Sequence, residues 1–149
     1  MEAVVEFHGF KDNYNRFIVK ELAVASENFQ IQLVFKAPYE QNVLTERSRK
    51  TVWWLERNFH LINWGEGGIP YDEGFIRGLL KPFDSVHTKG LEKADFLREF
   101  HPNVNIIADN VVSSECTVRC TLPQHSNASQ KCALRTAVGY YKTITLETW

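Results

Sequence analysis

The chain has 149 residues, of which 44% are hydrophobic and 23% charged, and its formal net charge at pH 7 is −1. This size and composition fit one globular domain with a buried core, and we expect a single domain over residues 1–149. A charge so close to neutral argues against a protein whose whole surface binds nucleic acid, although a local basic patch is compatible with it. No apolar run approaches the ~18 residues that a membrane span needs, so we expect no membrane partner.

Residues 1–10 lack the basic and then apolar order of a secretory signal peptide. We therefore expect an intracellular location, in the cytoplasm or the nucleus. In such a reducing compartment the three cysteines, Cys116, Cys120 and Cys132, are better explained as metal ligands or buried thiols than as disulfide partners.

The N-terminal third predicts the antiparallel start of a β-sheet. Val4–Phe7 is a short candidate strand, and residues 11–15 form a turn rich in Asp and Asn, which tolerate left-handed backbone. Residues 17–25 read as a largely buried strand. Residues 29–35 alternate apolar and polar side chains as a half-buried strand does.

Two helices are predicted next. Thr45 can cap a helix that runs to about residue 59, and Asp72 can cap a second helix that Pro82 ends. The first helix has an apolar face at helical spacing. The residues of that face are Val52, Trp54, Leu55 and Phe59.

Strands and helices alternate in the rest of the chain. We expect a strand at residues 85–87, a helix at 91–100, a strand at 104–108 and a last helix at 132–145. Two strand–helix alternations after an antiparallel start predict an α/β fold, a mixed β-sheet with helices packed on its faces.

Three segments, in order, resemble motifs of the DnaQ-like 3′–5′ exonucleases, which have an RNase H-like fold. Residues 17–23 resemble the first strand of that family, residues 84–97 its middle motif and residues 125–134 its last motif. The resemblance covers about residues 17–146. It implies an RNase H-like mixed sheet whose central strand is Phe17–Val24, with Cys132 opening the last helix against that strand.

The departures from the family concern its metal-binding carboxylates. Such exonucleases hold two divalent ions that stabilise the attacking and leaving oxygens. Here Glu21 is the carboxylate that matches the first motif, whereas Ala23 stands where the second acid would be and Cys132 replaces the last. The middle motif offers Glu92 and Lys93 near its expected acid. We expect magnesium-dependent exonuclease activity to be absent, while a residual ribonuclease activity stays open.

One branch of this superfamily, the Maelstrom domain of piRNA-pathway proteins, has Glu, Cys, His and Cys in place of the acids, and this set binds zinc. Glu21, Cys120, His125 and Cys132 stand in the same order here. The resemblance therefore implies a zinc ion held by these four residues.

The spacing of the last three candidates suits zinc by itself, because two thiols and an imidazole fall within a short loop and a helix start. Cys116, from the same loop, is the alternative to Glu21 as the fourth ligand. The structural alternative is a buried Cys132 and an exposed His125 with no metal.

The helix that begins after Thr45 carries basic residues interleaved with tryptophans. Such a pattern can follow a phosphate backbone and stack bases. The alternative is an amphipathic helix with tryptophan in the core and a solvated face, whose charge Glu46 and Glu56 dilute. The candidate nucleic-acid-binding residues are Arg47, Arg49, Lys50, Trp53 and Arg57.

These features predict a zinc-stabilised domain that binds nucleic acid, single-stranded RNA above all. Its setting would be small-RNA silencing, a virus that suppresses silencing, or a mobile element. The alternatives are an active nuclease that cleaves RNA and a catalytically inactive scaffold that binds a protein partner.

Overall fold

The computed structural model describes residues 1–113 and 132–146; Cys116, Cys120 and His125 lie outside this part of the chain. Its elements, in chain order, are β1 (Glu2–Lys11), β2 (Phe17–Ala25), β3 (Gln30–Val34), a short 3-10 helix (Gln41–Val43), α1 (Glu46–Asn58), α2 (Glu73–Leu80), β4 (Ser85–Lys89), α3 (Leu91–Leu97), β5 (Val104–Ile107) and α4 (Ala133–Leu146).

The described strands form one five-stranded sheet in the order β3-β2-β1-β4-β5. β1 pairs antiparallel with β2, and β2 antiparallel with β3, whereas β4 runs parallel to both β1 and β5. These strand directions, with helices in the connections that lead to β4 and β5, define an RNase H-like α/β fold. The predicted fold class is confirmed.

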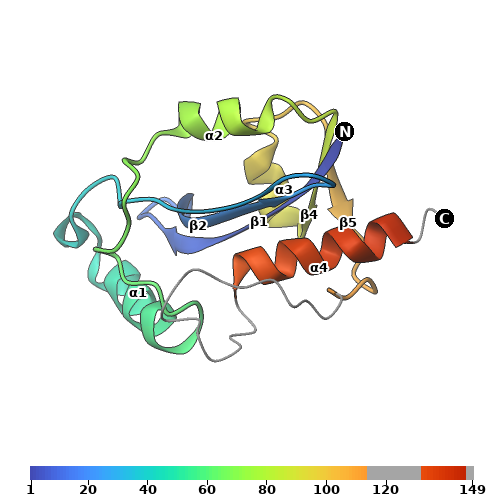
Figure 1. The fold of residues 1–149 in the computed structure, drawn as a ribbon. Helices are drawn as coiled ribbons and strands as arrows, with labels where there is room; N and C mark the ends of the chain where they lie inside the picture. Colours follow the sequence, from blue (N-terminus) through green and yellow to red (C-terminus); the bar gives the residue numbers. More distant parts are fainter. Residues whose placement is uncertain (114–131, 147–149) are drawn as a thin grey trace.

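Helices cover both faces of the sheet (Figure 1). On one face, Val5 and Phe7 of β1 pack with residues of α2 and α3, such as Leu80 and Leu97. On the other face, Val4 of β1 packs with the first turns of α4. Both faces of β1 are therefore buried, which explains its apolar run.

The prediction that Phe17–Val24 is the central strand is wrong. That segment is β2, which lies between β3 and β1, and the central strand is β1. β1 is also longer than the Val4–Phe7 strand expected from the sequence. Its residues beyond the expected strand include Gly9, a poor strand former, and both His8 and Gly9 pair with β2.

A bulge in the β1–β2 pair changes which face of the sheet the first side chains of β2 occupy. His8 pairs with Glu21 but Gly9 pairs with Val19, so Lys20 is the extra residue. A Cβ atom on Gly9 would lie 2.0 Å from the carbonyl oxygen of Ile18, so this position requires glycine. Before the bulge, Ile18 packs with the core beneath α1 instead of the core beneath α2.

The predicted capping residues begin the helices α1 and α2. The Thr45 hydroxyl accepts a hydrogen bond from the Ser48 amide at the start of α1, and the Asp72 carboxylate accepts one from the Gly74 amide at the start of α2. In the β1–β2 turn, Asn15 has a φ of 65°, the left-handed conformation that asparagine tolerates.

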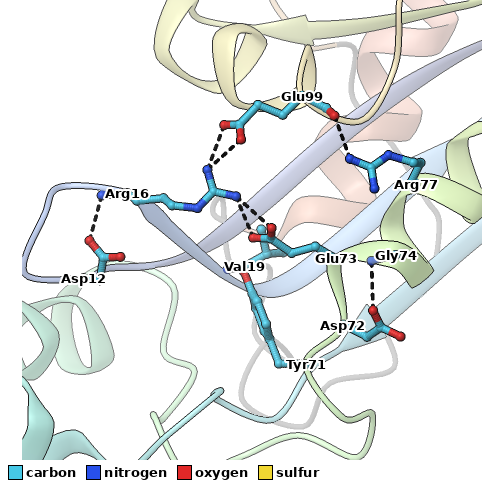
Figure 2. A network of polar contacts seen from close by, with 9 residues as sticks. All are labelled: Asp12, Arg16, Val19, Tyr71, Asp72, Glu73, Gly74, Arg77 and Glu99. Atoms are coloured by element: carbon cyan, nitrogen blue, oxygen red, sulfur yellow. Dashed lines mark hydrogen bonds and ion pairs between the residues drawn. The ribbon is translucent and has the colours of Figure 1, made fainter.

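Arg16 joins this turn to two helical segments (Figure 2). Its guanidinium donates to both carboxylate oxygens of Glu73 at the start of α2, at 2.8 Å. It also donates to both carboxylate oxygens of Glu99, which follows α3, at 2.9 and 2.8 Å. The guanidinium carbon lies 5.0 Å from the centre of the Phe96 ring. This bidentate pairing orients α2 and α3 over the same end of the sheet.

α4 packs across β2 and β1, and Cys132, immediately before it, is fully buried. The prediction that Cys132 opens the last helix against the sheet is confirmed, although the strand it meets is not the central one. Across residues 1–113 and 132–146, no helix combines the length and apolarity that a membrane crossing requires.

Candidate functional site

The fold brings two of the predicted metal ligands together. Glu21 in β2 and Cys132 at the start of α4 are 111 positions apart in the chain, yet the Cys132 sulfur lies 4.0 Å from Glu21 Oε2. Both side chains are fully buried. Gln32 of β3 donates to Glu21 Oε2 at 2.7 Å and lies 3.7 Å from the Cys132 sulfur. A carboxylate and a thiol thus share a closed site beneath the start of α4.

This pair could supply two of the four ligands of a metal ion, since zinc accepts both carboxylate oxygen and cysteine sulfur. In the described part of the chain, no cluster of three or more His, Cys, Asp or Glu side chains could hold a metal. The other predicted ligands, Cys120 and His125, and the alternative ligand Cys116 lie outside the described residues.

A second buried acid lies on the central strand, and the sequence predictions missed its importance. Glu6 of β1 is 5% exposed, and its carboxylate forms an ion pair with the ammonium of Lys93 in α3. The same ammonium donates to the carbonyl oxygen of Phe7 at 2.7 Å, and the Phe7 amide donates to Glu6 Oε1 at 3.1 Å. An acid inside the apolar run Val4–Phe7 was the available signal, because a buried carboxylate needs a cationic partner.

The outer face of α1 carries the predicted nucleic-acid-binding residues. Trp53 is 54% exposed, and the guanidinium carbon of Arg57 lies 4.5 Å from the centre of a Trp53 ring. Arg47, Arg49 and Lys50 are also exposed on α1. One surface of α1 therefore combines basic groups with an accessible aromatic ring.

The apolar face predicted for this helix is partly wrong. Trp54 is 51% exposed, and Val52 is the buried residue of α1. Leu55 and Phe59 are half-buried and line a cavity of about 320 Å³ between α1 and β1. Within the described part of the chain, Trp54 is half exposed instead of buried, so the apolar face of α1 is narrower than its spacing predicts.

This cavity is largely aromatic, with cationic groups among its walls. Phe10 and Phe17 contribute from the β1–β2 pair, and the lysines are Lys11 and Lys93. A polar hollow adjoins it and shares Lys11 and Thr51 with it, and Arg47 is one of the residues that line that hollow. An aromatic ring bound in the cavity would therefore lie next to the basic side chains that line the adjoining polar hollow.

Lys20, the bulged residue of β2, is a buried amine. Its ammonium donates to the carbonyl oxygens of Trp64, at 2.8 Å, and of Glu66. Burial lowers the pKa of Lys20 to about 8, against the opposing effects of the Glu66 and Glu56 carboxylates. The glycine-rich segment at residues 65–68 is thus held to the sheet through Lys20.

The unfolding free energy of the wild type relative to Lys20→Met should rise with pH between about 8 and 10.5. In this window the unfolded chain keeps the Lys20 proton that the folded protein has lost, so the cost of burying the charge disappears. We expect a relative gain of about 2 kcal/mol between pH 8 and 10, at 1.36 kcal/mol for each pKa unit. Urea titrations of both proteins at each pH measure it.

Measuring the wild type relative to Lys20→Met cancels the contribution of tyrosine ionisation to the unfolding free energy. Burial raises the pKa of Tyr71, so tyrosine ionisation lowers stability at high pH in both proteins alike. The lost hydrogen bonds to Trp64 and Glu66 add an offset that does not depend on pH. A difference in unfolding free energy that stays constant from pH 7 to 10 would contradict the assignment of Lys20 as a titrating buried amine.

Comparisons of this chain with protein-family models, with curated proteins and with solved structures gave no match.

Proposed function

We propose that this domain binds single-stranded RNA through the outer face of α1. The observation that carries the proposal is the exposed Trp53 ring, with Arg57 against it, on a helix that also presents Arg47, Arg49 and Lys50. The proposed setting is intracellular, in small-RNA silencing, in its suppression by a virus, or in a mobile element.

The charges on α1 are available to phosphates. Lys50 lies 3.6 Å from Glu46 and Arg57 lies 3.7 Å from Glu56, distances that give weak, solvent-screened pairs. Binding to RNA would replace these pairs and release counterions from the strand. The Trp53 ring would stack with a base whatever its identity, so we expect affinity without sequence preference.

The aromatic cavity beside α1 supports a single strand over a duplex. Bases in single-stranded RNA can leave the stack and insert between aromatic side chains. The cavity is lined by Phe10, Phe17 and Phe59, and the residues Lys11 and Thr51 link it to the polar hollow at the start of α1.

We further propose that zinc stabilises the domain, with Glu21, Cys120, His125 and Cys132 as ligands and Cys116 as the alternative to Glu21. The donor types support it, because a buried carboxylate and a buried thiol lie 4.0 Å apart beneath α4. When bound, the ion would supply structural cross-linking rather than chemistry on a substrate. In that role it would tie α4 to β2.

The proposed function does not include magnesium-dependent exonuclease chemistry. Such chemistry uses carboxylates that bridge two divalent ions. On the central strand, the negative charge of Glu6 is already paired with the ammonium of Lys93. This pairing supports a binding role over a catalytic one.

Replacing Arg49 and Lys50 together by glutamate should weaken RNA binding about tenfold or more at low salt and reduce the slope of log K against log salt by about 1.4. Each lost phosphate contact releases fewer counterions, so the salt dependence falls with the affinity. Fluorescence anisotropy of a labelled oligouridine at several salt concentrations measures both. The matched control is Lys81→Glu with Lys142→Glu, the same charge change on residues outside α1, which should leave binding unchanged.

Trp53→Ala in the same assay should cost about 1–3 kcal/mol of binding energy and little stability, because the ring is half exposed. An RNA affinity that is unchanged in a folded Arg49→Glu, Lys50→Glu protein would remove α1 as the binding surface. Loss of folding in Trp53→Ala would place that ring in the core.

A further inference from the structure

Two adjoining hollows lie at the end of α2, away from the α1 surface. The larger, of about 610 Å³, is lined by residues of α2 and of the segment that follows α3. The smaller, of about 290 Å³, is lined mostly by apolar side chains. Phe83, between α2 and β4, lines both. One continuous surface therefore has a polar part and an apolar part.

The larger hollow is basic, with Arg77, Lys81 and Arg98 among its walls. Arg77 donates to the carbonyl oxygen of Glu99 at 3.0 Å (Figure 2), and its guanidinium carbon lies 5.4 Å from the centre of the Phe100 ring. Arg98 donates to Asp95 and, at 3.2 Å, to the carbonyl oxygen of Val104. The ammonium of Lys81 forms no ion pair with the described residues. Two of the three cations are thus oriented in advance.

The acids that line this hollow are engaged elsewhere. Both carboxylate oxygens of Glu99 accept from Arg16. The carboxylate of Asp84 contacts the amino group of Met1. Because Arg98 is itself paired with Asp95, the cations of this hollow that have no carboxylate partner among the described residues are Arg77 and Lys81. These two charges suit a ligand with carboxylates or other anions.

The smaller hollow suits an aliphatic or aromatic side chain. It is lined by Phe29, which is 39% exposed, and by Leu79 and Pro82. Gly78 of α2 also lines it, and a Cβ atom on Gly78 would meet no other atom within 4 Å. Glycine within a helix costs stability relative to alanine, and the backbone here does not require it. The missing side chain leaves this hollow open.

We propose that the two hollows together dock a segment of a partner protein that presents an apolar side chain beside two or more carboxylates. The apolar side chain enters the hollow at Gly78, and the carboxylates meet Arg77, Lys81 and Arg98. A peptide fits better than nucleic acid, because the apolar walls are aliphatic as well as aromatic and an RNA backbone offers no aliphatic anchor. This surface is separate from α1, so the inference stands independently of RNA binding.

The probe is a short fluorescein-labelled peptide in which leucines alternate with pairs of glutamates, and its control is the same peptide with serine for leucine. The wild type should bind the leucine peptide and bind the serine peptide about tenfold more weakly, because only the first fills the hollow. Lys81→Glu should weaken binding of the leucine peptide about tenfold, whereas Lys142→Glu, an equal charge change on α4, should leave it unchanged.

Gly78→Leu tests the apolar hollow without risk to the fold. The added side chain meets open space, and leucine favours a helix more than glycine does. Its melting temperature should equal or exceed that of the wild type while its affinity for the leucine peptide falls about tenfold. Gly78→Ala should melt higher and bind as the wild type does.

Three results would overturn the proposal. Equal binding of the leucine and serine peptides would mean that the apolar hollow takes no part and that the surface binds anions in general. Unchanged affinity in both Lys81→Glu and Gly78→Leu would show that the peptide binds elsewhere. A loss of oligouridine binding in Lys81→Glu would make the basic hollow a nucleic-acid contact.

Discussion

Cys132→Ala should release zinc from the purified protein and lower the unfolding free energy by several kcal/mol. The proposed ion connects α4 to β2, and its binding energy is available only in the folded state. The wild type should carry one zinc ion per chain by elemental analysis, and a strong chelator should lower its melting temperature. Cys132→Ala should melt where the chelated wild type melts and should not respond to the chelator.

Val138→Ala separates loss of metal from loss of packing. Val138 of α4 is 3% exposed and belongs to the same apolar cluster as Cys132. This variant should lose about 1–2 kcal/mol from packing and still respond to the chelator. Glu21→Gln and Cys116→Ser, measured in the same way, identify the fourth ligand. A wild type without stoichiometric zinc whose melting does not respond to the chelator would exclude the site.

Lys93→Met should lower the unfolding free energy by about 3–5 kcal/mol, the usual cost of leaving a buried charge without its partner. The side chains of Glu6 and Lys93 are 6% and 24% exposed, so water cannot replace the lost ammonium at Glu6. Urea unfolding followed by circular dichroism measures the change. The double variant Glu6→Gln, Lys93→Met should recover most of the loss, because it removes the buried charge as well as its partner.

The matched control is Lys11→Met, which breaks the ion pair of Lys11 with Glu92. The side chains of that pair are 32% and 60% exposed, so its loss should cost less than about 1 kcal/mol. Similar losses in Lys93→Met and Lys11→Met would mean that Glu6 is hydrated and that the pair on the central strand has no special weight. A large loss in Lys93→Met alone supports the assignment of Lys93 of α3 as the cation that neutralises the buried Glu6 of β1.

The sequence prediction and the structure differ in the strand that is central to the sheet. The sequence predicts Phe17–Val24 as that strand, with Glu21 as its acid. The topology puts β1 at the centre, where Glu6 and His8 face the α4 side of the sheet and His8 pairs with Glu21. Glu6 is thus the buried acid of the central strand, whereas Glu2 of the same strand is exposed. Glu21 keeps its place in the proposed zinc set because Cys132 lies against it.

Local structure could be predicted from the sequence because its causes act within a few residues. Thr45 and Asp72 begin helices by accepting hydrogen bonds from amides two or three positions later. Asn15 permits the left-handed turn between β1 and β2. Alternation and apolar runs gave β2, β3 and the helices, and their order gave the α/β class.

The tertiary structure alone decided which strand is central, which helix face is buried and which polar groups meet. β1 is central because both of its faces are covered, and that depends on α2, α3 and α4 together. Trp54 is half exposed, because none of the described elements buries its side of α1. Glu6 and Lys93 are 87 positions apart, and Glu21 and Cys132 are 111 apart. Contacts over such separations depend on how whole elements pack, whereas helix caps, turns and side-chain periodicity act only within one element.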